Sequence, residues 1–151
     1  MRQSYTTLFS SNEVRMAANA PDRVQFLQDI NRHNLSIKAQ RCGALNGYTI
    51  GAFAIALCVG KMKYFGISLN TIGRLLKRVD PERLSVLMDQ LAVGKISELI
   101  VLVRDSNSQE SEVPTCVCSW EEVAAVSRTQ GASFMPIETY EAISSKLKGI
   151  W

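Results

Sequence analysis

The sequence contains a single histidine, His33, so no second histidine can share a catalytic or metal-binding role with it. A nucleophilic triad needs a base beside a serine or cysteine, and a phosphate-binding loop needs a glycine-rich segment between a strand and a helix. Neither pattern occurs, and Glu121, Glu122, Glu138 and Glu141 are explained as charges in the first turns of helices. The sequence therefore predicts a protein that is not an enzyme and has no cofactor.

Long apolar runs are also missing. The longest, at residues 50–60 and 99–103, are far shorter than the ~20 residues that a membrane-spanning helix needs. The first residues, MRQSYTTLFSSNE, contain no apolar core after Arg2, so we expect no secretory signal. With 46% hydrophobic residues the chain has the composition of a folded globular protein. We expect a cytoplasmic protein with no membrane partner.

Cysteine is sparse, and Cys42, Cys58, Cys116 and Cys118 do not form the disulfide framework of a small secreted domain. Cys116 and Cys118 are two residues apart, so on a strand their thiols share one face and make weak candidates for a soft-metal or redox site. No histidine or second close cysteine pair completes such a site. Because free cysteine behaves as a small hydrophobe, we favour core packing and expect no metal.

The net charge of +3 hides a division between the two halves of the chain. Residues 1–78 contain 11 Lys and Arg against three Asp and Glu, a net charge of +8, whereas residues 79–151 contain six against 11, a net charge of −5. A polyanion is the partner that the first half favours, and the second half would avoid it. The alternative is that two solvated faces of opposite sign attract each other.

The first half opens with signals for two short helices. Ser10 and Glu13 form the capping box of a helix that ends near Asn19, and Pro21 is predicted as the first residue of a second helix that runs to about His33. Two such helices joined by a short turn form a helix-turn-helix unit. Helical periodicity places Val24, Leu27 and Ile30 on the inward face of the second helix. Its outward face is then predicted to present Arg23, Gln25, Gln28, Asp29 and Arg32.

A basic β-hairpin is predicted next. Residues 35–41 alternate apolar and polar, Gly43 and the pair Asn46-Gly47 are turn signals, and residues 48–50 are the expected returning strand. Lys38 and Arg41 lie in this hairpin. A strongly apolar helix over residues 51–65 should form the centre of the core, and Ser68 should cap a further helix that ends at the basic residues 77–78.

The second half alternates helices and strands. Asp80 and Pro81 should open an amphipathic helix, whose apolar stripe is followed by a strand at residues 98–104 paired with residues 115–119. Ser119 should cap a helix to about residue 129, and a short segment at 133–135 should precede a last helix over 136–147. The apolar stripe, expected to pack within its own domain or against a second copy of the chain, consists of Leu84, Leu87, Met88 and Leu91. We expect the same packing, within the domain or against a second copy, for the residues on one face of the strand, Leu99, Val101 and Val103.

The predicted fold class is α+β, with an N-terminal winged helix-turn-helix at residues 1–78. It is followed by a small α/β domain at residues 79–151 with a two- or three-stranded antiparallel sheet, which would serve dimerisation or bind an effector or partner.

The order of elements over residues 8–76 resembles the MerR-type winged helix-turn-helix DNA-binding domain. The motif that carries the resemblance best is Gly66-Ile67-Ser68-Leu69 with Ile72 and Leu75-Leu76, similar to the end of that domain. Further matches are Phe9, Glu13-Val14, Ala17-Ala18, Pro21 and Tyr48-Thr49. The long coiled-coil helix of the family's metal and drug sensors is missing, and small phage excisionases and terminase subunits resemble the same domain.

The resemblance implies sequence-specific binding to double-stranded DNA, as a transcriptional regulator. A homodimer is expected because one recognition helix reads only a few base pairs. Arg and Gln match guanine and adenine edges in the major groove, whereas phosphate contacts require only positive charge and reach. The candidates for base contact are Arg23, Gln25, Gln28 and Arg32, and those for phosphate contact are Arg15, Lys38 and Arg41.

Two other functions are consistent with the sequence: a phage-type DNA architectural or assembly factor, and a protein-interaction adaptor that does not bind DNA. The acidic second half is expected to offer a surface to a protein partner.

Overall fold

The fold is that of a computed structural model, which describes residues 9–33, 35, 37–42, 45–77, 79–103, 116–130 and 133–136. Helices combine with small antiparallel sheets, so the fold class is α+β. In chain order the elements are α1 (Ser11–Ala17), α2 (Arg23–His33), β1 (Gln40–Cys42), β2 (Leu45–Gly47), α3 (Ile50–Tyr64), α4 (Leu69–Leu75), α5 (Pro81–Ala92), β3 (Ile100–Val103), β4 (Cys116–Val117), α6 (Trp120–Gln130) and β5 (Ser133–Pro136).

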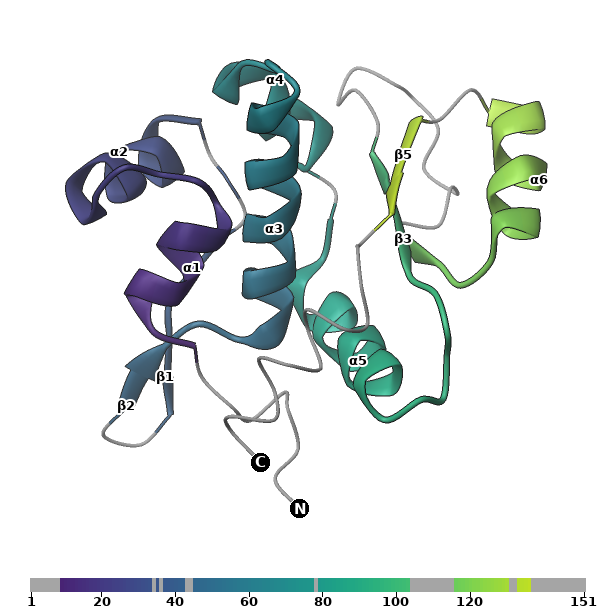
Figure 1. The fold of residues 1–151 in the computed structure, drawn as a ribbon, viewed down its shortest axis with the longest axis horizontal. Helices are drawn as coiled ribbons and strands as arrows, with labels where there is room; N and C mark the ends of the chain where they lie inside the picture. The colour runs from purple at the N-terminus through teal and green to yellow at the C-terminus, as the bar shows by residue number, and fades with distance from the viewer. Residues whose placement is uncertain are drawn as a thin grey trace.

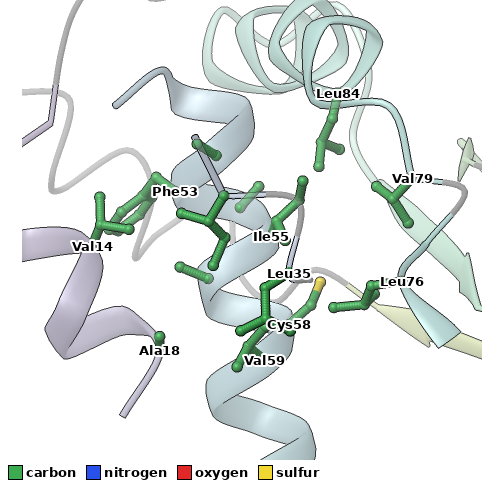
Figure 2. Close-up of a cluster of buried hydrophobic side chains, with 14 of the residues drawn as sticks. Val14, Ala18, Leu35, Phe53, Ile55, Cys58, Val59, Leu76, Val79 and Leu84 are labelled. Atoms are coloured by element: carbon green, nitrogen blue, oxygen red, sulfur yellow. The ribbon is translucent and has the colours of Figure 1, made fainter. Parts of the chain in front are cut away.

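Helix α3 runs through the middle of the molecule (Figure 1). It is apolar on all sides, and such a helix is stable only when other elements cover every face. Val14 of α1 and Ala18, which caps the end of α1, lie on one side of it and Leu84 of α5 lies on another (Figure 2). Helix α1 approaches closely because Gly60 has no side chain, and a Cβ there would collide with the carbonyl oxygen of Ala17.

A hydrogen bond from α5 also stabilises the first turn of α3. The Gly51 N–H donates to the Ser85 hydroxyl at 2.9 Å, and this hydroxyl donates to the Pro81 carbonyl, also at 2.9 Å. The Thr49 hydroxyl accepts from the Ala52 N–H at 3.2 Å. Because the first N–H groups of a helix have no partner within it, these two hydroxyls satisfy donors that are buried in the core.

Several helix starts are confirmed where the sequence places them. Ser10 and Glu13 form the capping box of α1, Ser68 caps α4, and Asp80 caps α5 with Pro81 as its first residue. The start of α2 is wrong by two residues. Pro21 lies before the helix, and the Asp22 carboxylate accepts from the Gln25 N–H at 2.8 Å as its cap.

The hairpin is shorter than predicted and shifted along the chain. Strand β1 begins at Gln40, so Lys38 precedes it, and β2 contains Asn46 and Gly47, which were expected to form a turn. The predicted returning strand at residues 48–50 is wrong. Tyr48 instead pairs with Phe9 in an isolated bridge, with N–H···O distances of 2.7 and 2.9 Å, and the next two residues cap and begin α3.

The second sheet has the strand order β4-β3-β5, and both pairings are antiparallel. This confirms a three-stranded sheet and the predicted partner strand: Ile100 pairs with Val117, and Val101 pairs with Cys116. Val101 and Cys116 belong to the hydrophobic core, and Ile100 and Val117 are buried on the opposite face of the sheet. Helix α6 lies beyond the sheet, away from α3 (Figure 1). Of the last predicted helix, Pro136 lies in β5 and residues 137–147 are outside the described residues.

Most of the buried hydrophobic residues that the structure describes form one cluster, from Phe9 to Cys116. Leu84, Met88, Leu91 and Leu99 belong to it, so they are covered by the chain itself. Helix α5 therefore packs on the core of the first half, and the domain boundary at residue 78 stays a prediction. Among the described residues, no helix is long and apolar enough to span a membrane.

Candidate functional site

The outward face of α2 differs from the predicted one because the helix is rotated about its axis. Phe26 and Asp29 are buried, whereas Val24 is 66% exposed and Leu27 is 39% exposed. The predicted inward face is therefore wrong for Val24 and Leu27, and Ile30 is half-buried. The Phe26 ring meets the Tyr48 ring edge to face, which holds this register, and the Gln25 amide donates to the Asp29 carboxylate, which lets that carboxylate be buried.

Six side chains of α2 project outward as a stripe two residues wide. Residues 23 and 24, 27 and 28, and 31 and 32 are exposed, and positions four apart are neighbours on a helix surface. We call this set the α2 stripe: Arg23, Val24, Leu27, Gln28, Asn31 and Arg32. The sequence predicted three of its members, Arg23, Gln28 and Arg32. It missed Asn31 and the two apolar residues. Phe26 could have revealed them, because burying this large side chain turns residues 24, 27 and 31 outward.

The α2 stripe contains no carboxylate. Asp29, the one acidic residue within the helix, was expected to face outward but is only 6% exposed. Its Oδ1 accepts from Gln25 Nε2 at 2.7 Å, so the Gln25 amide bonds within the chain and its side chain is half-buried. Asp22, just before the helix, is exposed, and its carboxylate caps the helix. The stripe thus presents two positive charges with donors and acceptors between them.

The side chain of Arg15 stabilises the turn between α1 and α2 through hydrogen bonds. Its Nε and Nη2 donate to Asn12 Oδ1 at 3.2 and 2.7 Å, and its Nη1 donates to the carbonyls of Ala20 and Pro21 at 2.8 and 3.2 Å. The turn contains Asn19 at φ 56°, a left-handed conformation that asparagine tolerates better than most residues. Contact of Arg15 with a phosphate stays a prediction, since the structure gives its guanidinium intramolecular partners.

Two further contacts fix the turn and the end of α2. Lys63 Nζ, in the last turn of α3, donates to the Asn19 carbonyl at 2.8 Å. At the other end of α2, a Cβ at Gly73 would collide with the carbonyl oxygen of His33, so α2 and α4 meet backbone to backbone. Helix α2 is therefore held at both ends by the helices behind it, which leaves its stripe free to face solvent.

The β1–β2 hairpin lies on the same side of α3 as α2, away from the three-stranded sheet (Figure 1). Arg41 pairs with Asn46 across the hairpin, and Lys38 is exposed just before β1. Tyr48 connects the hairpin to the core: its backbone pairs with Phe9, and its ring meets Phe26 of α2 with centroids 6.2 Å apart. Helix and hairpin are thus linked through one aromatic contact.

Exposed acidic residues of the second half lie on other elements. Glu82 is on α5, Glu98 precedes β3, and Glu121 and Glu122 open α6. Helix α6 lies beyond the sheet, on the opposite side of α3 from α2 and the hairpin (Figure 1). The two arginines of α2 and the two glutamates that open α6 thus belong to helices on opposite sides of α3 (Figure 1).

The three cysteines whose surroundings are described are free thiols. Burial raises the pKa of Cys58 from 9.0 to about 12 and that of Cys116 to about 11, and it also raises the pKa of Cys118. Strand β4 ends at Val117, so the half-buried Cys118 follows it. Within the described part of the chain, no three His, Cys, Asp or Glu side chains gather as a metal site. For Cys58 and Cys116, the surroundings are those of core packing.

No protein-family model matches the sequence, and no curated protein or solved structure is significantly similar to it.

Proposed function

We propose that the protein binds double-stranded DNA, with α2 in the major groove and the β1–β2 hairpin against the phosphate backbone. The observation that carries this proposal is the α2 stripe. It combines the guanidinium of Arg23 and the amide of Gln28, whose forks match guanine and adenine edges, with no carboxylate to repel phosphate. A helix face that only contacts water can include acidic residues. In α2 the one acidic residue, Asp29, is instead buried, so the exposed face has none.

In this proposal the chain is a MerR-type winged helix-turn-helix protein that acts as a transcriptional regulator. Helices α1 and α2 are the helix-turn-helix, and the hairpin is the wing. The Arg15 and Lys63 contacts at the turn support it, because a recognition helix must be held at a fixed angle to read bases. Contacts from Lys38 and Arg41 to phosphates would position the helix without selecting sequence.

The active species in this proposal is a homodimer. Helix α2 has 11 residues, so it is about 16 Å long and reaches only a few base pairs. The second half is the proposed contact between copies, because β4 and β5 are the outer strands of its sheet and outer strands have unpaired backbone groups. The acidic residues of this half would keep the contact away from DNA.

Titration of a random-sequence duplex with the full chain, at salt concentrations from about 50 to 200 mM, tests the proposal. We expect the logarithm of the affinity to fall linearly with the logarithm of salt. Lys38→Ala with Arg41→Ala should weaken binding to all duplexes alike and reduce the slope by about 1 for each lost phosphate contact. The matched control is Arg83→Ala with Lys95→Ala, which removes two exposed cations of the second half and should leave the slope unchanged. Undetectable binding at the lowest salt concentration would refute DNA binding.

A further inference from the structure

Two of the side chains in the α2 stripe are exposed and apolar. Val24 and Leu27 are three residues apart, so they are neighbours on the helix surface. Each also has a polar stripe residue four positions away: Gln28 follows Val24, and Arg23 precedes Leu27. Each member of the apolar pair therefore lies beside a hydrogen-bonding side chain on the same surface of the helix.

This exposure is built into the packing of the helix. Rotating α2 to bury Val24 and Leu27 would withdraw Phe26 from its contact with the Tyr48 ring and expose the Asp29 carboxylate. The close approach of Gly73 to the His33 carbonyl holds the far end of the helix. In the part of the chain that the structure describes, the pair therefore stays exposed, and its surface is open to a partner from outside.

We propose, on the basis of the proposed function, that Val24 and Leu27 recognise thymine by contact with its C5-methyl group. That methyl is the one apolar group that the four bases present in the major groove, and apolar side chains contact it directly. Arg23 and Gln28 would then select guanine and adenine beside it. A protein partner fits the stripe less well, because interface cores are depleted of charge whereas Arg23 lies beside Leu27 and Arg32 lies further along the same stripe.

The test is the replacement of thymine by uracil, which removes the methyl group and keeps base pairing. A duplex is first selected from a random library with the full-length protein, and each thymine is then replaced in turn while the dissociation constant is measured. We expect one or two positions to lose about fourfold in affinity for each methyl removed. Val24→Ala with Leu27→Ala should bind thymine and uracil duplexes equally at those positions.

The matched control is Val86→Ala, which truncates an exposed valine on α5 and should keep the discrimination of the natural sequence. Arg23→Ala is a second control: it should weaken binding and keep the thymine preference. Because Val24 and Leu27 are exposed, the double variant should fold, and circular dichroism checks this.

Salt-dependent binding without any thymine preference overturns this inference and leaves the proposed function standing. The inference also fails, and the proposed function stands, if the selected motif contains no thymine or if the double variant still prefers thymine over uracil. Absence of duplex binding overturns the proposed function itself, so the two failures are distinguishable.

Discussion

The ring of Phe26 on α2 meets the ring of Tyr48 at the end of the hairpin edge to face, with centroids 6.2 Å apart. Both side chains are buried, and the backbone of Tyr48 pairs with Phe9 at the edge of the core. This contact therefore connects the two elements that the proposed function brings to DNA. Together with the close approach of Gly73 to His33, it holds the register of α2 and so the members of the α2 stripe.

Phe26→Ala should lower the free energy of unfolding by about 3–5 kcal/mol, because it removes a buried ring and leaves a cavity. The contact itself is measured with Phe26→Leu, Tyr48→Leu and the double variant, whose coupling energy should be about 0.5–1.5 kcal/mol. Urea unfolding gives these values. The finding would be contradicted by a coupling energy of zero with both single variants folded.

Gly73→Ala should destabilise the protein by about 1–3 kcal/mol, because the new methyl group meets the carbonyl oxygen of His33 and pushes α2 away from α4. Alanine is the better helix former, so helix propensity alone predicts the opposite sign. Asn70→Ala, at an exposed position of the same helix, is the matched control and should change stability by less than about 0.5 kcal/mol. Thermal unfolding of the three proteins decides between the two signs.

The two glutamines of α2 should behave differently. Gln28 is exposed on the α2 stripe, so Gln28→Ala should change the preferred base at one position of a selected DNA motif, at a cost of about 1–3 kcal/mol. Gln25 donates to the buried Asp29, so Gln25→Ala should lower stability and leave the motif unchanged. Selection from a random library with each variant checks this. A motif altered by Gln25→Ala alone would reverse the assignment.

The buried thiol of Cys58 should make stability depend on alkaline pH. Its pKa is raised from 9.0 to about 12 in the folded state, so the folded protein retains a proton that the unfolded chain loses above pH 9. This contribution is complete below pH 9 and is lost as pH rises from 9 to about 12. Lysines and tyrosines titrate in the same window, so the measurement is the difference between the natural protein and Cys58→Ala, which should shrink as pH rises.

Alkylation at neutral pH gives an independent measurement of the same burial. Cys118 is half-buried and should react before Cys58 and Cys116, which are buried from the reagent and whose pKa values burial raises to about 12 and about 11. In urea all the cysteines should react at similar rates. A fast reaction of Cys58 in the folded protein would show that the α3 core opens.

The sequence alone determined those features that depend on neighbours along the chain. The Ser10–Glu13 box and the Asp80-Pro81 start were predicted correctly because a cap bonds to a backbone group two or three residues away. The pairing of the strand at 98–104 with 115–119 was also predicted, because both segments are β-rich and flank a polar loop. The difference in net charge between residues 1–78 and 79–151 follows from the composition of the sequence alone.

Tertiary structure decided which face of α2 points outward. Val24, Leu27 and Ile30 satisfy helical periodicity, whereas the observed inward face contains the Asp29 carboxylate, so the apolar pattern favoured the wrong face. The choice depends on Tyr48 and Gly73, which lie 22 and 47 residues from Phe26 in the sequence. Burial of Asp29 required the Gln25 amide as its hydrogen-bond partner, since a carboxylate is buried only when it is bonded. The acid-free stripe is therefore a product of packing, and periodicity in the sequence could not have revealed it.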